Sequence, residues 1–293
     1  MTVVKKIKEF VIERCIFLSG IASIVFVILI FIFLAKEGVL LFKTVGLPDF
    51  LRGRFWYPIS DPAKFGILPL IMGSLLVTAG AIMIAIPLGI ASAFYIADVA
   101  SPKVRDVLKS LVEILSAIPS VVLGFIGMVT LVPFIKYFFK IPTGLTALSG
   151  SIMLAFMALP TIISISEDAI NAVPRQYKEG AIALGATHWQ TLYRVVLFGA
   201  LPGIIAASML GVGRVIGETM AVMMITGNAA VIPHTFLQPV RTLTATIAAE
   251  MGETVRGSEH YYALFAIGIA LFIMSFIINI TADTFLNKNK GKR

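Results

Sequence analysis

Charged residues are scarce in this chain. Asp, Glu, Lys and Arg make up 14% of it and hydrophobic residues 58%, whereas an average soluble domain has about 25% charged residues. Cysteine is nearly absent as well. Cys15 is the one cysteine, which excludes an internal disulfide and a cysteine-based metal cluster; we expect it to be a small apolar residue at the start of a span. This composition predicts a membrane protein.

Several motifs of enzymes are also missing. The sequence has no G-x-x-x-x-G-K-[ST] phosphate-binding loop, no H-E-x-x-H and no G-x-S-x-G, so it lacks the usual parts of an ATPase, a zinc peptidase and a serine hydrolase. Residues 211–217 lack the glycine spacing of a dinucleotide-binding turn, although Gly213 and Gly217 form a G-x-x-x-G typical of close helix packing. We therefore expect no catalytic residue, no cofactor and no bound metal.

The excess of basic over acidic residues in the chain has two explanations. A formal net charge of +8 would suit a nucleic-acid-binding protein, because basic patches attract phosphates. In a chain this apolar, loops that face anionic lipid and the cytoplasm explain the same charge. Membrane lipid is thus an expected partner, and nucleic acid is not.

Long apolar runs predict an all-α, polytopic membrane fold. Several runs exceed the roughly 18 apolar residues that mark a spanning helix, and a buried soluble core would explain one such run rather than five or six. The six predicted transmembrane helices cover about residues 16–35, 66–97, 107–135, 145–166, 195–225 and 262–285.

These spans divide the rest of the chain. We expect a cytoplasmic N-terminal segment over residues 1–15, an extracytoplasmic segment over 36–65, a core of five spans over 66–285, and a basic, disordered cytoplasmic tail over 286–293. No small-residue cleavage site follows the first apolar run, which is also long for a signal peptide. We therefore expect a retained anchor.

Prolines mark the expected bends and starts of these helices. Pro69 and Pro87 allow the second apolar region to bend or end early. Ser101 followed by Pro102 is typical of a helix start. Pro119 falls inside the third predicted span.

The distribution of basic residues predicts the orientation. With the N-terminus inside, Lys and Arg are more numerous in the inner segments than in the outer ones, as the positive-inside rule requires. Both termini and the segment from Pro174 to Pro202 are then cytoplasmic, and the chain is a multi-pass protein of the cell membrane.

Residues 174–202, PRQYKEGAIALGATHWQTLYRVVLFGALP, form a charged segment between long apolar runs. Pro174 suits a first helical position, and Gly185 suits the left-handed residue that ends a helix. Thr187 and Gln190 have the spacing of a capping box that starts a second helix. The segment therefore predicts two short helices outside the bilayer, a surface suited to a partner.

The segment resembles the coupling loop of ABC importer permeases, known as the EAA motif. Tyr177, Ala181 and Leu184 share one face of its first helix. Glu179-Gly180-Ala181 fits the start of the motif and Gly185 its glycine, while Phe198 stands where the family usually has proline.

In the family this loop docks into a groove of a separate ATPase subunit, a helix-in-groove contact. The resemblance implies this role for Glu179, Gly180, Ala181, Leu184, Gly185 and Thr187. An amphipathic loop lying on the membrane surface is the alternative.

Three further stretches resemble phosphate-specific (Pst) ABC permeases of the PstC type. GVGRVIGETMAVMMITGN, residues 211–228, resembles their fifth-span signature, VEILSAIPSVVLGFIG their third span, and FGILPLIMGSLLVTAGAIMIAIPLGIASAFYIA their second. The resemblance covers most of the chain from Phe65 onward. It implies the MetI-like fold of type I ABC importer permeases and an ATP-driven import of inorganic phosphate. The implied partners are a second permease subunit of the PstA type, two ATPase subunits of the PstB type and an extracytoplasmic phosphate-binding protein of the PstS type.

Arg214 and Glu218 are ionisable residues within the fifth predicted span. Such groups normally face a bundle interior or a solvated path, and four residues apart they share one helix face. The planar fork of arginine suits phosphate oxygens. Glu218 would neutralise Arg214 in an empty path and accept a protonated phosphate oxygen, which sulfate cannot offer. With Thr219, they are the predicted substrate-path residues.

Other interpretations of these residues stay open. Arg214 and Glu218 would also suit a buried structural ion pair. Glu113 is a third candidate, structural or on the path, and Glu167 and Asp168 are expected to be solvated. The chain as a whole could serve another oxyanion, such as molybdate or sulfate, or be a membrane scaffold or sensor that does not transport.

Overall fold

The structure is a computed structural model and describes residues 3–290 of the chain, most of them helical. The longer helices are α1 (Val3–Gly38), α3 (Leu68–Phe94), α4 (Pro102–Ala117), α7 (Ala147–Asn171), α10 (Leu197–Gly217) and α13 (Glu259–Lys290). The shorter ones are α2 (Leu47–Arg52), α5 (Ser120–Ile126), α6 (Val132–Phe139), α8 (Arg175–Ala183), α9 (His188–Thr191), α11 (Met220–Ile225) and α12 (Leu243–Glu250). Helical turns η1 (Val39–Lys43), η2 (Tyr95–Val99), η3 (Gly127–Leu131) and η4 (Leu192–Val196) connect some of them, and β1 (Trp56–Tyr57) pairs with β2 (Lys64–Phe65).

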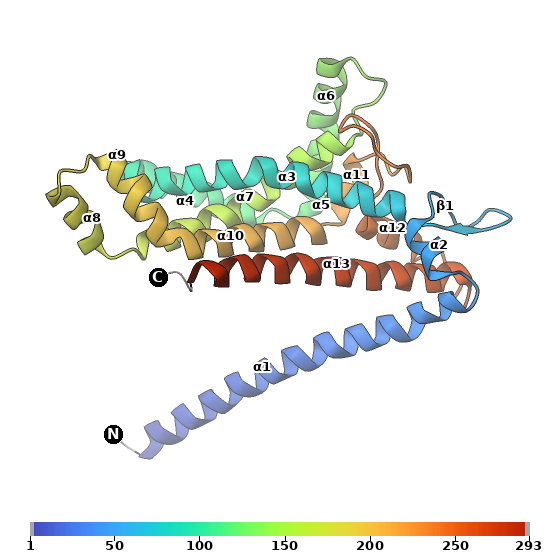
Figure 1. Cartoon of the computed structure of the whole chain (residues 1–293), viewed down its shortest axis with the longest axis horizontal. Helices are drawn as coiled ribbons and strands as arrows, with labels where there is room; N and C mark the ends of the chain where they lie inside the picture. The colour runs from blue at the N-terminus through green and yellow to red at the C-terminus, as the bar shows by residue number, and fades with distance from the viewer. Residues whose placement is uncertain (1–2, 291–293) are drawn as a thin grey trace.

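Six helical stretches of the described chain are long and apolar enough to cross a membrane. They are Glu9–Lys43, Leu68–Val99, Ser120–Phe139, Ala147–Asn171, His188–Gly217 and Glu259–Thr281. The prediction of six spans is confirmed in number and order. Figure 1 shows α3, α7, α10 and α13 running side by side, with α8 and α9 beyond one end of this bundle and β1 at the other. These ends are named the α8 end and the β1 end below.

Small residues bring α3, α7 and α10 close together. A Cβ at Gly80 of α3 would lie 2.4 Å from Ser151 Oγ, and one at Gly89 would lie 2.6 Å from Ile162 Cγ2. Gly211 of α10 lies against the same Ile162, where a Cβ would come within 2.6 Å of Cγ1. Such close approach is how helices pack where lipid removes the hydrophobic driving force. The three helices therefore form the rigid centre of the molecule.

The third span begins later than predicted. The helix expected over residues 107–135 is interrupted at Ile118 and Pro119, both in extended backbone. A residue before proline is driven out of the α region, and proline has no N–H to continue the helix. Residues before the break form α4, which starts at Pro102 after Ser101 as predicted and has no buried side chain. The span itself runs from Ser120 to Phe139.

The fifth predicted span is also interrupted. Its helix was expected to continue to Ile225, but α10 ends at Gly217 and Glu218 is extended, with φ −70° and ψ 135°. The chain turns at Thr219 and resumes as α11. The carbonyl of Glu218 is satisfied by the Thr244 hydroxyl, 2.8 Å away. Non-helical backbone at membrane depth is tolerated where protein satisfies it or where it lines a solvated cavity.

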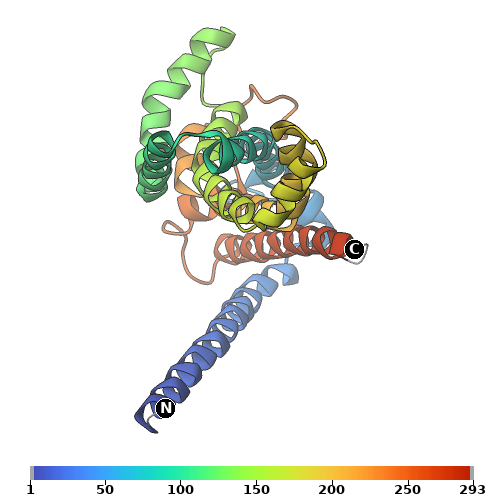
Figure 2. The same cartoon turned by 90° about the vertical axis from the view of Figure 1, so that its left-hand side faces the viewer.

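The first and last helices pack together at the β1 end. Gly38 of α1 lies against Ala266 of α13, where a Cβ would meet the backbone nitrogen at 2.9 Å. Figure 2 shows α1 leaving the bundle toward its N-terminal end. From Glu9 to Phe33 its side chains are exposed, Cys15 among them. Because α13 continues as a helix to Lys290, the prediction of a disordered tail is wrong over 286–290. Residues 291–293 lie outside the described residues.

The Glu250 carboxylate binds side chains from three segments at the β1 end. Glu250 of α12 accepts hydrogen bonds from Trp56 Nε1 (3.0 Å to Oε2) and from Arg241 Nη1 (2.6 Å to Oε1), and its Oε2 lies 2.8 Å from His260 Nε2. Trp56 belongs to the polar segment 36–65, which thereby becomes a fixed cap on this end of the bundle.

Glu167 is buried, contrary to the prediction that it is solvated. Its side chain is 5% exposed and its Oε1 lies 2.8 Å from Lys109 Nζ of α4. Asn171 Nδ2 donates to the same oxygen at 3.2 Å. Its neighbour Asp168 is exposed, as predicted. The apolar periodicity of α7 turns one of these adjacent carboxylates inward, and Lys109 compensates the buried charge.

We expect Lys109→Met to destabilise the protein by about 2 kcal/mol. The change leaves the buried Glu167 carboxylate with Asn171 alone, and an uncompensated buried charge costs up to about 5 kcal/mol; the half-exposed position of Lys109 reduces the loss. Thermal unfolding of the purified protein in detergent measures it. Lys103→Met, at an exposed position of the same helix, is the control. Equal melting temperatures for the two variants would contradict the prediction.

Candidate functional site

Arg214 lies on a face of α10 that no described residue covers. The residue is exposed, in the last turn of the helix and inside the fifth span. Its Nη1 donates to Thr161 Oγ1 of α7 at 3.3 Å. Gly213 and Gly217 beside it are exposed too, and no heavy atom lies within 4 Å of the position a Cβ would take. The predicted close packing of this G-x-x-x-G is therefore not made within the described chain.

Glu218 does not pair with Arg214. Among the described residues Arg214 forms no ion pair. The carboxylate Oε1 of Glu218 instead accepts from the backbone N–H of Ala221 at 3.3 Å, at the start of α11. The reason is the helix break: Glu218 is no longer one helical turn above Arg214 but at the start of the next helix, where a carboxylate is favoured. The predicted neutralisation of Arg214 by Glu218 is thus not formed here.

Thr219 and α11 complete this region. The Thr219 hydroxyl donates to the carbonyl of Gly217 at 3.2 Å and so stabilises the turn. Behind it α11 is anchored in the core, since Ala221 is fully buried and packs on Gly124 of α5. The break between α10 and α11 is therefore a fixed part of the fold, with Arg214 on one side and the Glu218 carboxylate on the other.

The segment from Pro174 to Pro202 forms one short helix beyond the bundle, α8. The second predicted helix, α9, is not separate: it continues through η4 into α10 and begins the fifth span, His188–Gly217. Gly185 has φ +85°, the left-handed conformation expected of it. The capping box is confirmed: Gln190 N–H donates to Thr187 Oγ1 at 3.3 Å, and Thr187 N–H donates to Gln190 Oε1 at 2.9 Å. Pro174 precedes the first helical residue instead of being it, a difference of one position.

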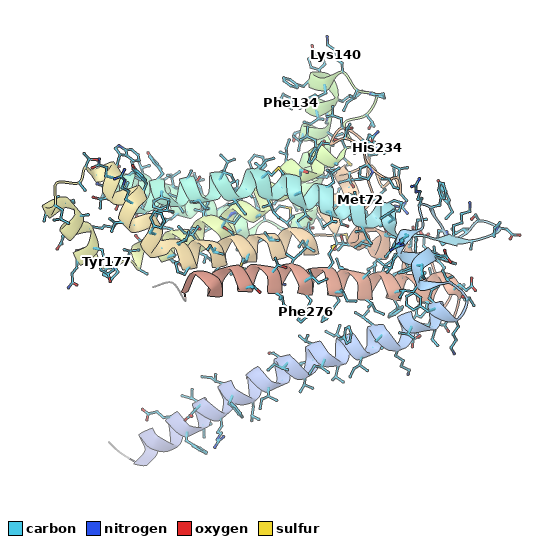
Figure 3. All side chains as sticks on the ribbon, in the orientation of Figure 1. Met72, Phe134, Lys140, Tyr177, His234 and Phe276 are labelled. Carbon is cyan, nitrogen blue, oxygen red and sulfur yellow. The ribbon has the colours of Figure 1, made fainter. Side chains whose placement is uncertain are left out.

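Large apolar side chains of this segment are exposed. Leu184, Trp189 and Tyr177 are 91%, 67% and 61% exposed, and Figure 3 shows Tyr177 at the α8 end, far from Met72 and His234. Gly180 is exposed with no heavy atom within 4 Å of a Cβ, and no residue of α8 is buried. The remaining predicted members of this surface are Glu179, exposed, and Ala181, half-buried. Trp189 lies at the start of the fifth span, whereas Tyr177 and Leu184 lie outside the spans. Exposed apolar groups outside the spans mark an interaction surface.

Two contact residues were not identified from the sequence. Thr161 holds the Arg214 guanidinium, and no pattern in its apolar run distinguishes it. Asp98 pairs with Lys178 of α8, Oδ1 to Nζ at 2.6 Å, and with His188 of α9, Oδ2 to Nε2 at 3.1 Å. The sequence did single out Asp98, because it is the only Asp, Glu, Lys, Arg or His between Lys64 and Lys103.

Glu113 belongs to neither of these regions. It lies on α4, which has no buried residue, and it is exposed. Among the described residues it has no ion pair. The structure therefore places it outside the contacts of Arg214 and of residues 174–202.

These features together describe a class of protein: a multi-pass membrane protein with an exposed arginine inside a span and an exposed apolar surface at one end of the bundle. Its fold is similar to a chain of the inward-facing MetNI methionine ABC transporter, with TM-score 0.60 and 19% identity over 76% of this chain and 96% of that one. It is also similar to a chain of a bacterial alginate ABC transporter, with TM-score 0.64 and 16% identity over 96% and 95%. The predicted fold of type I ABC importer permeases is confirmed.

Residues 85–289 match the family of binding-protein-dependent transport system inner membrane components. The chain belongs to this family. It is 42% identical to the probable ABC transporter permease protein YqgH of Bacillus subtilis, over 84% of this chain and 80% of that one. It is 36% identical to the phosphate transport system permease protein PstC of Mesorhizobium japonicum, over 78% and 75%. The chain is thus a multi-pass inner-membrane component of a binding-protein-dependent transport system.

Proposed function

We propose that this chain is the permease subunit through which an ABC importer moves inorganic phosphate across the membrane. The observation that carries the proposal is Arg214: a guanidinium inside a span, without a carboxylate partner among the described residues, on a helix face left open. An unpaired cation at membrane depth is costly and typically marks an ion path. Arginine presents a donor fork that matches phosphate oxygens. The relatives named PstC support phosphate as the anion.

The path needs a second subunit. The open face of α10, with Gly213 and Gly217 beside Arg214, suits close approach of a helix from another chain. Two similar permease chains would then enclose the guanidinium and exclude lipid from it. By similarity to the Pst system, we assign this role to a chain of the PstA type.

ATPase subunits outside the membrane supply the energy that moves the two permease chains. In our proposal two ATPase subunits of the PstB type bind the exposed surface of α8 and α9, centred on Leu184, and a PstS-type protein delivers phosphate to the β1 end. The α8 end is then cytoplasmic. Both α1 and α13 have their outer termini at that same end (Figure 1), which agrees with the predicted cytoplasmic termini.

The mechanism is alternating access. Phosphate released at the β1 end meets the Arg214 guanidinium, and Glu218 and Thr219 lie at the adjacent helix break. Closure of the ATPase subunits on ATP displaces α8 and α9, and the two permease chains rock so that Arg214 faces the other side. A permease for sulfate or molybdate would share every part except the choice of anion. A scaffold that does not transport would have no use for an unpaired arginine inside a span.

Uptake measurements test this function. Cells that lack their own high-affinity phosphate system are given this chain with its neighbouring subunits, and uptake of radiolabelled phosphate is followed with sulfate and molybdate as competitors. Saturable phosphate uptake that neither competitor inhibits is the expected result. Inhibition by molybdate or sulfate, without phosphate uptake, would assign the system to that anion. An assembled complex that moves none of the three would refute transport.

Glu218→Gln is expected to lower the preference for phosphate over sulfate by about tenfold, the value of one hydrogen bond to a charged group. Oε1 of Glu218 is engaged with Ala221 N–H, whereas Oε2 accepts no hydrogen bond from a described residue and can accept one from a protonated phosphate oxygen. Sulfate offers no such proton. Competition of sulfate against radiolabelled phosphate measures the preference, with Glu253→Gln at an exposed position as control. An unchanged preference would show that Glu218 does not select the anion.

A further inference from the structure

Asp98 stands where α3 meets the segment formed by α8 and α9. It belongs to η2, the helical turn that follows α3, and its side chain is only 13% exposed. One carboxylate oxygen binds Lys178 of α8 at 2.6 Å, and the other lies 3.1 Å from Nε2 of His188 in α9. A single carboxylate thus contacts both short helices.

The turn that carries Asp98 is itself held firmly. Arg105 of α4 donates from Nε to the carbonyl of Ile96 at 2.8 Å and from Nη2 to the carbonyl of Ala97 at 2.6 Å. Both carbonyls belong to residues directly before Asp98. Ile96 and Ala97 are also buried. Asp98 therefore projects from a rigid base fixed to α3 and α4.

The helix α8, by contrast, has few contacts besides the one with Asp98. None of its residues is buried, so apolar packing contributes little to its position. Lys178 is its one residue that forms an ion pair among the described residues, and its side chain is 26% exposed. The orientation of α8 relative to α3 therefore depends on this polar contact and on the chain connections at either end.

The contacts of α3 continue toward Arg214. Along its length α3 packs on α7 through Gly80 against Ser151 and Gly89 against Ile162. The residue before Ile162 is Thr161, which accepts a hydrogen bond from Arg214. A displacement of η2 thus has a continuous route of packed backbone and side chains to the guanidinium.

We propose that Asp98 is the positioning residue that couples α8 and α9 to α3, so that a movement imposed on the short helices shifts the helices around Arg214. This inference rests on the proposed function, because it needs ATPase subunits acting on α8. Asp98 touches no substrate in this role. Its contribution is to make the weakly packed α8, the start of the α9–α10 helix and the end of α3 move as one body.

The test is Asp98→Asn in the complete complex. The isosteric amide removes the charge that holds Lys178 and His188 but keeps the size of the side chain. We expect phosphate uptake to fall about tenfold, within the range of coupling between sites, while ATP hydrolysis by the assembled complex, reconstituted with its phosphate-binding protein, is retained. Both are measured on the same proteoliposomes. In a complex that assembles, an equal loss of both rates, like two unchanged rates, would overturn the proposal.

Two further variants sharpen the result. Asp106→Asn removes an equivalent charge from an exposed position of α4, where no described residue pairs with it, and is expected to leave the ratio of uptake to hydrolysis unchanged. The exchange Asp98→Lys with Lys178→Asp restores a pair of opposite sign at the same place. If Asp98→Asn fails to assemble, this exchange decides: recovered uptake per ATP supports the proposal, and no recovery refutes it.

Failure of the inference differs from failure of the proposed function. If the chain is not a phosphate permease, the wild-type complex itself takes up no phosphate. If Asp98 does not couple the helices, the wild type transports phosphate and Asp98→Asn transports it with the same yield per ATP.

Discussion

Replacing Arg214 with alanine is expected to lower phosphate uptake by about tenfold to a hundredfold. The expected loss is that of one hydrogen bond between charged groups, worth about 1.5–3 kcal/mol. The protein should still fold, because Arg214 is exposed and its one hydrogen bond, to Thr161, is 3.3 Å long. Uptake of radiolabelled phosphate measures the loss, and co-purification of the other subunits verifies assembly.

Two variants serve as comparisons for this result. Arg214→Lys keeps the charge but loses the planar fork, so its uptake should lie between wild type and alanine. Arg256→Ala removes an exposed arginine from the loop before α13 and should transport like the wild type. If Arg214→Ala takes up phosphate at the rate of Arg256→Ala, the guanidinium is not on the path.

Leu184→Asp is expected to abolish binding of the ATPase subunits. A leucine that is 91% exposed gains nothing from the isolated fold, so its replacement should leave the stability of the chain unchanged. At the centre of an interface, a buried apolar anchor is worth about 2 kcal/mol or more, and aspartate adds an unpaired charge to the groove. Co-purification of the ATPase subunit with the tagged chain measures binding, and uptake should be lost with it.

Ile59→Asp is the matched control for Leu184→Asp. Ile59 is equally exposed, at 90%, but lies at the β1 end, between β1 and β2. Both variants carry the same change in polarity and charge, so a general effect on membrane insertion would appear in both. Equal recovery of the ATPase subunit with the two variants would place its docking surface elsewhere.

The spans were predictable from the sequence, whereas the two breaks within them were not located. Length and apolarity fix the number and order of the spans, since a run of about 20 apolar residues has few other solutions. Pro119 marked the first break, but the apolar residues of α4 before it hid the boundary. The second break carries no proline. Glu218 leaves the helix because the Thr244 hydroxyl, 26 residues further along the chain, satisfies its carbonyl.

In the candidate site, too, some features could be predicted from the sequence and others could not. Local signals predicted the turn between α8 and α9 well: the left-handed Gly185 and the capping box of Thr187 depend on neighbours within a few residues. The surroundings of Arg214 depend on tertiary contacts. A four-residue spacing predicts a pair with Glu218 only if the helix continues, and Thr161 is brought to Arg214 by the packing of α7 on α10.

The Glu250 cluster sets a constraint on biogenesis. Trp56 and the carboxylate that holds it are 194 residues apart, and α1 packs on α13. A chain made from its N-terminus reaches these partners only after all the segments between them have been made. The helix α1 must therefore wait in the bilayer without its neighbour while the four intervening spans are inserted. The cap at the β1 end is accordingly the last part of the molecule to close, and only a chain translated through α12 and α13 can close it.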